Sequence, residues 1–336
     1  MRRSVDVVIA ARNEARHLGA CLESIAAQDY PNGLLRVFVV DNGSTDDTAA
    51  IAERFPAAKL SVRLLRQSTP SAAASRNVGI ANGTGELIAL LDGHCTISPT
   101  WVSAMVARFD DPLIGGCQAR IDSRSVSPRI QRYLNESGEL SNDRILDDTV
   151  SGRRNIYPWI LSGNSVYRRK AIEDAGGFEV SLAACEDVDL AWRVVLLGYH
   201  LAYVPEAVAV HYDGNSWFRF VRKGLTYGAG AAQLARRYEP HGATNKFVPP
   251  KMLTTSLERS VSAAYYAAGY RLKDVRMRLG LDPLPTPVPH ADVPSEFRPR
   301  FRWTDAATLR VAPSAIYWMR DGAEPASVVV HVPSRQ

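Results

Sequence analysis

The segment Glu86-Leu-Ile-Ala-Leu-Leu91, followed directly by Asp92-Gly-His94, determines the expected fold. An uninterrupted apolar run of this length, bounded by polar residues, is typical of a strand that is buried on both faces of a sheet. Such strands occur mainly in parallel sheets, which have helices packed on both faces. We therefore expect residues 86–91 to form a central strand of an α/β protein.

The segments on either side of this strand alternate between strand and helix patterns. Strands are expected over residues 5–10, 36–40 and 61–65, and helices over 14–27, 48–55 and 71–82. Strands separated by helices indicate βαβ units and a mostly parallel sheet. Further along, residues 120–160 are polar and irregular, apart from a helix expected over 128–142.

The rest of the chain predicts more helices. They are expected over residues 186–197, 216–237 and 256–279, and a strand pair is expected over 200–204 and 207–211. Six prolines between residues 283 and 299 exclude a regular helix or a central strand there. Short β-like pieces end the chain, notably residues 326–332.

The composition is that of an ordinary globular protein. Of 336 residues, 46% are hydrophobic and 22% charged, which excludes a disordered chain, collagen and a small disulfide scaffold. No segment approaches the roughly 20 apolar residues that span a bilayer. Asp6 and Arg12 interrupt the apolar run that follows the basic N-terminus, which favours a strand over an export signal. The four cysteines form no CxxC pair and are expected to be free thiols in the cytoplasm.

Positive charge is concentrated in the second half of the chain. The net charge is +5, but residues 219–310 contain 16 Lys or Arg and 7 Asp or Glu, a local net charge of +9. A basic region of this kind attracts phosphate, anionic lipid or nucleic acid, and charge alone does not choose among them.

Polar clusters follow three of the predicted strands. They are Ala11-Arg-Asn-Glu14, Asp41-Asn-Gly-Ser44 and Asp92-Gly-His94. Ligands of open α/β sheets bind at the carboxyl ends of the strands. A single acidic residue there is usually a helix cap, but three clusters together indicate a ligand site at this edge of the sheet.

Several motifs, taken in order, resemble those of family 2 glycosyltransferases with the GT-A fold. They are Ala11–Glu14, Asp41-Asn-Gly-Ser-Thr-Asp-Asp-Thr48, Ser75-Arg-Asn-Val-Gly79, Asp92-Gly-His-Cys95, Gly176-Gly-Phe178 and Glu186-Asp-Val-Asp-Leu-Ala-Trp-Arg193. The resemblance covers residues 4–230. The Asp-Gly-His-Cys variant is similar to that of bacterial exopolysaccharide enzymes, which commonly carry C-terminal membrane segments that we do not find in this sequence.

The resemblance implies a cytoplasmic enzyme that moves a sugar from a nucleotide diphosphate, expected to be UDP, to an acceptor hydroxyl with inversion. The acceptor is a glycan, a lipid-linked molecule or a small molecule, and nucleic acid is not expected as a partner. A catalytic domain is expected over residues 1–230. The helical and Pro-rich extension over 231–336 is assigned to acceptor binding or oligomerisation, and a homodimer and weak peripheral membrane contact stay open.

The nucleotide is expected to bind at the ends of the first two strands and at the buried strand. The resemblance assigns to Asp41 the role of accepting the N3–H of uracil. The alternative is a cap for the next helix, although Ser44 and Asp46 are better placed for that. Arg76 resembles the arginine that the family places near the base and phosphates, although a solvated helix arginine is the alternative. The full set is Ala11, Asn13, Glu14, Asp41, Ser44, Arg76, Asp92 and Gly93.

Asp92 and His94 occupy the position of the family's Asp-x-Asp motif, and His211 resembles its third metal ligand. Hard cations such as Mg²⁺ prefer oxygen ligands, and an imidazole in place of one carboxylate shifts the preference toward Mn²⁺. The alternatives are a capped turn residue at position 94 and a structural histidine at position 211.

Asp187 is the expected general base, and Glu186 is expected to orient it or to contact the acceptor. Carboxylates in the first turn of a helix are also favoured by the helix dipole, so capping is the alternative role for one of them. Asp189 is expected to pair with Arg193 one turn later, and Trp192 to be buried.

Two segments near these motifs have alternative interpretations. Residues 219–230, with Lys223 and Tyr227, could cover the donor diphosphate or form a solvated basic helix, and Gly163-Asn-Ser165 is expected to border the sugar pocket. A nucleotidyltransferase and a non-catalytic sugar-nucleotide or glycan-binding module are the rival functions. Ala11–Glu14 stands where the former usually has a Gly-rich basic loop, and the acidic doublet disfavours the latter.

Overall fold

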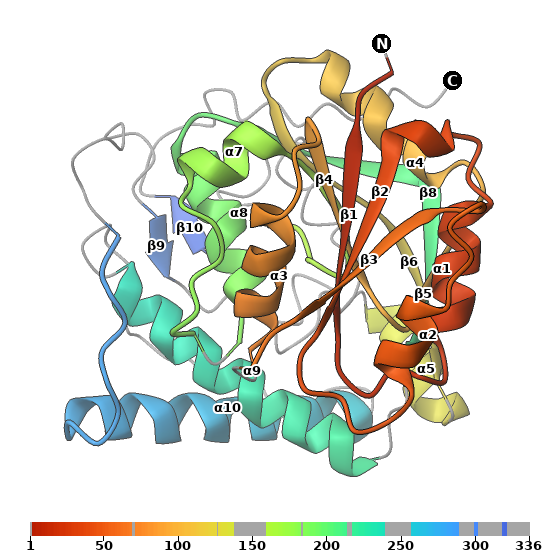
Figure 1. The fold of residues 1–336 in the computed structure, drawn as a ribbon. Coiled ribbons are helices and arrows are strands. Elements are labelled where there is room, and N and C mark those ends of the chain that lie inside the picture. Colours follow the sequence, from red (N-terminus) through yellow and green to blue (C-terminus); the bar gives the residue numbers. More distant parts are fainter. Residues whose placement is uncertain are drawn as a thin grey trace.

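The computed structural model describes residues 2–68, 71–125, 127–137, 159–182, 184–213, 217–238, 257–288, 299–301 and 318–320. Within these residues the chain forms an eight-stranded sheet in the order β3-β2-β1-β4-β7-β6-β8-β5. Figure 1 shows helices on both faces of this sheet and two long helices, α9 and α10, at one end of it.

One half of the sheet is entirely parallel. It comprises β1 (Val5–Ala11), β2 (Leu35–Asp41), β3 (Ser61–Arg66) and β4 (Leu87–Asp92). The four strands coincide with the four predicted from the sequence, and the α/β fold with a mostly parallel sheet is confirmed. Strand β4 is buried along its apolar length, as its uninterrupted apolar run predicted.

The other half of the sheet is mixed. Strand β7 (Asn164–Arg168) runs antiparallel between β4 and β6 (Ile114–Ser125), whereas β8 (His200–Asp213) is parallel to β6. The short strand β5 (Cys95–Ile97) pairs antiparallel with the far end of β8. The two β6 segments on either side of Ala119 pair with β8 in different registers.

Two predictions for this half were wrong. The strand pair expected over 200–204 and 207–211 is a single strand, because pairing with β6 resumes after an irregularity that includes Pro205. Residues 120–125, expected to be irregular, belong to β6. This end of β6 carries mostly polar side chains, and its strand conformation depends on pairing with β8, about 90 positions away in the sequence.

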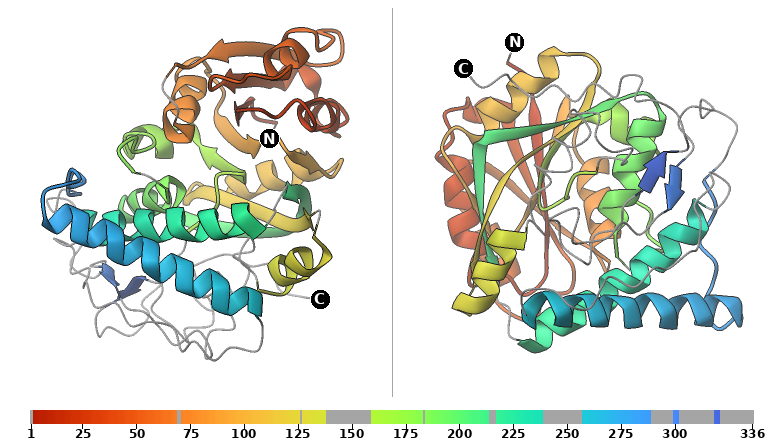
Figure 2. Two further views of the ribbon diagram at one scale, coloured as in Figure 1. Left: turned by 90° about the horizontal axis from the view of Figure 1, so that it is seen from below. Right: turned by 180° about the vertical axis from the view of Figure 1, so that it is seen from behind.

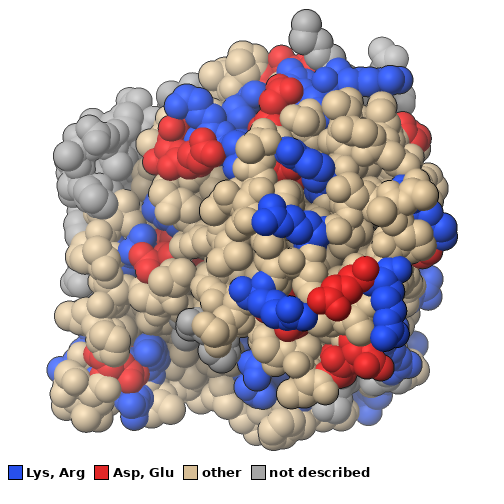
Figure 3. Space-filling view, viewed as in Figure 1, with Lys and Arg blue, Asp and Glu red and all other residues tan. Residues whose placement is uncertain are grey.

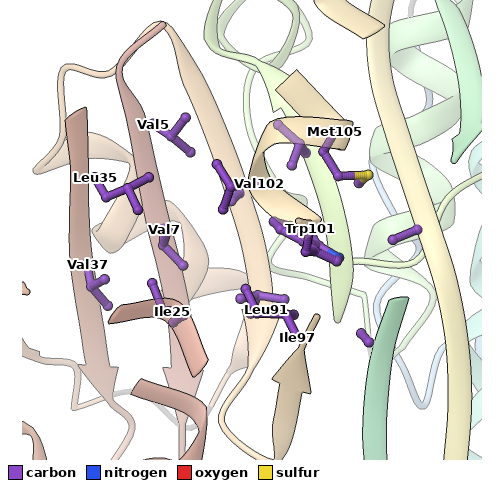
Figure 4. Close-up of a cluster of buried hydrophobic side chains, with 14 of the residues drawn as sticks. Val5, Val7, Ile25, Leu35, Val37, Leu91, Ile97, Trp101, Val102 and Met105 are labelled. Carbon is purple, nitrogen blue, oxygen red and sulfur yellow. The ribbon is translucent and has the colours of Figure 1, made fainter. Parts of the chain in front are cut away.

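Helices cover each face of the sheet and define two apolar cores. Helices α1 (Leu18–Ala26), α2 (Thr48–Glu53) and α4 (Trp101–Ala107) pack on one face, and α3 (Ala72–Ala81), α7 (Arg169–Asp174) and α8 (Glu186–Leu196) on the other. Alternate residues of β1 therefore enter different cores, Val7 on one side and Val8 on the other. Figure 4 shows Val7 with Trp101 and Met105 of α4 in the first core.

Helices α9 (Trp217–Arg237) and α10 (Leu257–Arg278) lie side by side in Figures 1 and 2. Glycines allow the close approach, because a side chain at Gly228 would overlap the carbonyl oxygen of Tyr266 and one at Gly269 would overlap that of Leu225. Helix α9 continues across residue 230, where the sequence placed a domain boundary. Among the described residues, no helix is both long and apolar enough to cross a membrane.

The remaining elements are short. They are η1 (Asn32–Leu34), η2 (Arg108–Asp110), α5 (Pro128–Ser137) and an antiparallel pair of β9 (Pro299–Phe301) and β10 (Trp318–Arg320). The β-like segment expected over 326–332 lies outside the described residues. On the face drawn in Figure 3, basic and acidic side chains lie next to one another, without a large region of one sign. All four cysteines are free thiols, as expected.

A buried ion network ties β1 to its neighbours. Asp6, with no exposed side-chain surface, bonds Arg36 of β2 at 2.7 Å and Arg169 of α7 at 2.6 Å. Its second oxygen also accepts the backbone N–H of Gly85, and side chains at Gly83 or Gly85 would collide with the carboxylate.

We expect Asp6→Asn to lower the free energy of unfolding by about 3–5 kcal/mol, because removing one charge leaves two guanidinium groups without their shared buried partner. Urea denaturation measures the change. The control is Asp110→Asn, which removes an ion pair of Arg3 with an exposed carboxylate and should cause little loss. Equal losses in the two variants would contradict the assignment.

Candidate functional site

A cavity of about 260 Å³ lies beyond the carboxyl end of β4. Six of the expected catalytic, nucleotide-binding and metal-ligating residues line it: Arg76, Asp92, His94, Glu186, Asp187 and His211. They come from α3, from the end of β4 and the turn after it, from the start of α8 and from the far end of β8. Residues far apart in the sequence therefore meet at this edge of the sheet. This edge is where open α/β sheets bind their ligands.

Arg76 lies between two of the carboxylates. Its Nη1 donates to Glu186 Oε1 at 2.7 Å, and its Nη2 lies 3.4 Å from Asp92 Oδ1. The guanidinium is also 5.5 Å from the centre of the Phe178 ring, and its side chain is only 8% exposed. Arg76 is therefore a buried site residue, and the alternative of a solvated helix arginine is wrong.

The turn that carries Phe178 is fixed by the neighbour of Arg76. Asn77 Nδ2 donates to the carbonyl of Phe178, and the N–H of Phe178 donates back to Asn77 Oδ1, both at 2.8 Å. Gly176 and Gly177 have φ of +79° and +74°, a backbone conformation that favours glycine. Two motifs that are separate in the sequence thus form one unit of the site.

Asp92, His94 and His211 form a cluster with metal-ligand chemistry. One ligand atom from each residue lies within 4.8 Å of the others, and the two imidazole Nε2 atoms are 3.0 Å apart. The pairing of β5 with β8 places Cys95 opposite His211, which brings the preceding His94 to the same point. One carboxylate and two imidazoles suit a first-row divalent metal better than Mg²⁺.

Glu14, in the loop after β1, contacts this cluster. Its Oε1 lies 2.9 Å from His94 Nδ1, the ring nitrogen opposite the one near His211. A carboxylate in this position fixes the tautomer and orientation of a metal-ligating imidazole. The structure therefore places the carboxylate of Glu14 against a histidine of the cluster.

The carboxyl of Asp92 stays ionised. Burial opposes the charge, but the contact with His211 and the charges of His94 and Arg76 hold the pKa of Asp92 well below its usual range. Gly163 borders it so closely that a side chain at position 163 would overlap the carboxylate.

In contrast to Asp92, Asp187 has an environment that raises the pKa of its carboxyl. Burial and the neighbouring negative charge of Glu186 raise the pKa of Asp187 to about 6, although Arg76 and the N–H groups of Val188 and Ser162 oppose the shift. Cys185, at the start of α8 with φ of +64°, turns the chain so that the helix begins in the cavity. A carboxyl with a raised pKa in a cavity is suited to accept a proton near neutral pH.

The loops after β1 and β2 are tied to each other. Asn13, with φ of +57°, donates its N–H to Ser44 Oγ at 3.0 Å, and its side chain accepts from Thr45. The carboxylate of Asp46 accepts the N–H of Thr48, the first residue of α2, although the N-cap residue of this helix is Asp47. The hydroxyl of Ser44 accepts the N–H of Asn13 and does not cap that helix.

Asp41 is buried and its Oδ1 accepts the N–H of Ser44 at 3.2 Å. It pairs with Ala11 in the register of β1 and β2. Gly93 lies against the side chain of Glu14, where a side chain would be crowded. The cavity described above is not lined by Ala11, Asn13, Glu14, Asp41, Ser44 or Gly93, so these expected nucleotide contacts form a separate group next to it.

The sequence indicated some of the other cavity residues only as one of two alternatives, and did not indicate others at all. Lys223 and Tyr227 of α9 line it, as one of the two interpretations of that segment required, and Gly163 does too. Ile121, Leu161, Ser162 and Cys185 were not singled out, because isolated residues of these types carry no pattern in the sequence. The expected pair of Asp189 with Arg193 is confirmed at 2.6 Å, and Trp192 is buried.

The fold and site together define a class: an α/β protein whose acidic, histidine-containing cavity opens at the carboxyl edge of a mostly parallel sheet. Residues 6–176 match the sequence profile of glycosyl transferase family 2. Because the match covers half of the chain, the chain belongs to glycosyl transferase family 2, as its motifs indicated.

Two curated relatives illustrate the similarity. The chain is 30% identical over 245 residues to a pre-mycofactocin glycosyltransferase of Mycobacterium tuberculosis, which covers 70% of this chain and 48% of that protein. It is 27% identical to the glycosyltransferase AglE of Haloferax volcanii, over 68% of this chain and 73% of the relative. The chain thus spans about half the length of the first relative.

Solved structures show the same fold. A mannosyltransferase from Pyrobaculum calidifontis in complex with GDP-Man and Mn²⁺ superposes with a TM-score of 0.55 at 20% identity, over 84% of this chain and 82% of that one. Residues 1–349 of Staphylococcus aureus TarS, in complex with UDP-GlcNAc, give a TM-score of 0.50 at 19% identity, over 82% and 92%. At these identities the likeness establishes the GT-A architecture.

Proposed function

We propose that the chain is an inverting glycosyltransferase that moves a sugar from a nucleotide diphosphate sugar to an acceptor hydroxyl. One observation carries the proposal: a carboxyl with a raised pKa, Asp187, lines the same cavity as the cluster of Asp92, His94 and His211. Such a transfer needs a proton acceptor next to a place where a leaving diphosphate can be held. Membership of family 2 supports the same reaction.

In the proposed reaction, Asp187 accepts the proton of the acceptor hydroxyl as its oxygen bonds to the anomeric carbon. The bond between that carbon and the phosphate oxygen breaks, and its electron pair leaves with the nucleoside diphosphate. Attack on the face opposite the leaving group inverts the configuration. Glu186, held by Arg76 at 2.7 Å, raises the pKa of Asp187.

Asp92, His94 and His211 are the proposed ligands of a divalent metal, Mn²⁺ or Mg²⁺, and their two imidazoles favour Mn²⁺. When bound, the metal would stabilise the charge that develops on the leaving diphosphate. Glu14 would hold His94 in the tautomer that leaves Nε2 available.

We assign the nucleoside to the loops after β1 and β2, with Asp41 accepting the N3–H of uracil. Its burial next to Asn13 and Ser44 and the pairing of Ala11 with Asp41 support this assignment. The TarS structure contains UDP-GlcNAc and the Pyrobaculum enzyme GDP-Man, so fold alone leaves both donors in competition. The division at residue 230, a homodimer and weak membrane-surface contact stay predictions.

UDP is expected to raise the melting temperature more than GDP does, and Asp41→Ala should remove this difference. Stabilisation by a ligand reaches about 2.7 kcal/mol at a hundredfold excess over Kd, enough for a clear shift in differential scanning fluorimetry. Asp47→Ala is the control, since Asp47 makes no side-chain cap bond in the α2 turn. A larger shift with GDP would contradict the uracil assignment.

For the metal site, His211→Ala is expected to abolish tight Mn²⁺ binding, measured by electron paramagnetic resonance. Glu14→Gln should weaken it by about 10–100-fold, because an outer carboxylate orients the ligating imidazole. His200→Ala at the start of β8 is the control and should bind normally. Transfer at the full rate in excess EDTA would rule out a metal-dependent reaction.

Asp187→Asn should reduce sugar transfer by about 10²–10⁴-fold, because the amide cannot accept the proton. UDP binding, measured by calorimetry, should stay close to that of the wild type. The base acts only when ionised, so the wild-type rate should rise with pH through about 6 and then level off, in line with the raised pKa of Asp187. A normal rate in the variant would move the role to Glu186, tested by Glu186→Gln.

A further inference from the structure

A buried ion network lies directly beneath the proposed base. Asp189, two residues after Asp187 on α8, has no exposed side-chain surface. Arg193 bonds its Oδ2 through Nη2 at 2.6 Å and Nε at 2.9 Å. Arg237 Nε bonds its Oδ1 at 2.6 Å, and the hydroxyl of Tyr238 lies 3.0 Å from the same oxygen.

Arg237 connects this carboxylate to three other parts of the fold. It ends helix α9, its Nη1 bonds Glu179 at 3.0 Å just after the Phe178 turn, and the same nitrogen donates to the carbonyl of Thr286. Its own carbonyl accepts the N–H of Val288 at 3.1 Å. Within the network, the two positive charges of Arg193 and Arg237 balance the two negative charges of Asp189 and Glu179.

Helix α9 also holds the chain on the other side of Asp187. Gly230 lies against the carbonyl of Ala184, where a side chain would overlap that oxygen. Cys185 Sγ is 3.8 Å from the carbonyl of Tyr227. The first turn of α8 is therefore fixed by α9 both before and after Asp187.

We propose that Arg237 is a positioning residue for Asp187, and that by holding Asp189 it makes the end of α9 part of the catalytic unit. The proposal rests on the proposed function. Residues two positions apart on a helix are separated by about 3 Å along its axis. A shift of Asp189 therefore moves Asp187 by nearly the same amount. Arg237 lies outside residues 6–176, which match the family profile.

A buried ion pair can contribute to stability without positioning Asp187. The test therefore needs a control variant that alters a similar ion pair elsewhere. Arg236, the preceding residue, bonds Asp274 of α10 at 2.9 Å and joins α9 to α10. Arg236→Lys and Arg237→Lys each keep the charge and remove the planar fork that bonds several acceptors. The second change alters a bond to Asp189 of α8, whereas the first alters the bond to Asp274 of α10.

The two variants are compared for transfer rate, UDP affinity and melting temperature. We expect Arg237→Lys to lower kcat by about 10–100-fold, because a displacement near 1 Å from a remote substitution has effects of that size. The Kd for UDP should stay within about twofold, and the rise of rate with pH should shift. Arg236→Lys should leave kcat and the pH profile unchanged.

Tyr238→Phe is the second variant, used if Arg237→Lys does not fold. It keeps the ring packed against Trp192 and removes only the hydroxyl that bonds Asp189. A smaller fall in kcat with normal UDP binding supports the positioning role. A wild-type kcat in folded Arg237→Lys, or equal losses in Arg236→Lys, overturns it.

Amide hydrogen exchange separates this proposal from the proposed function. Faster exchange at residues 186–190 in Arg237→Lys, but not in Arg236→Lys, shows that Arg237 holds the start of α8 whatever the activity. If the wild type transfers no sugar from any nucleotide donor, the proposed function fails and exchange alone decides whether Arg237 holds α8. Unchanged exchange at these residues overturns the positioning role.

Discussion

The arrangement of the site depends on one buried guanidinium. Arg76 is held between Asp92 at the end of β4 and Glu186 at the start of α8. A cation with an 8% exposed side chain must keep negative partners, because an unpaired buried charge is strongly destabilising. The parallel half of the sheet and the helix that carries the proposed base are therefore fixed relative to each other by charge as well as by packing.

The pKa values of two carboxyl groups in this cavity are shifted in opposite directions. Asp92 is stabilised as an anion by His211, His94 and Arg76, whereas burial and Glu186 raise the pKa of Asp187 to about 6. Groups whose environments push their pKa values apart are suited to different tasks. Here one carboxylate is suited to hold a cation and the other to accept a proton.

Much of the fold was predictable because β1, β2 and β4 are buried on both faces of the sheet and are therefore mostly apolar along their length. The apolar runs of β1, β2 and β4 and the helix pattern between them identified the parallel half. Strand β6 was not predicted, and residues 120–125 were expected to be irregular, since their side chains are mostly polar and their backbone partners lie in β8. For the site, a polar cluster at a strand end identified Asp92 and an acidic doublet at the start of a helix identified Asp187, but Ser162 and Ile121 line the cavity without any local pattern.

The sequence by itself determined the layered α/β architecture, the edge of the sheet where polar residues gather and the motifs of the family, because these depend on local periodicity and residue type. Only the tertiary structure decided which residues meet. His94 and His211 come together through the register of β5 on β8, and Asp189 meets Arg237 through the packing of α9 on α8. Neither contact leaves a local trace, since each depends on strand register or helix packing across long stretches of chain.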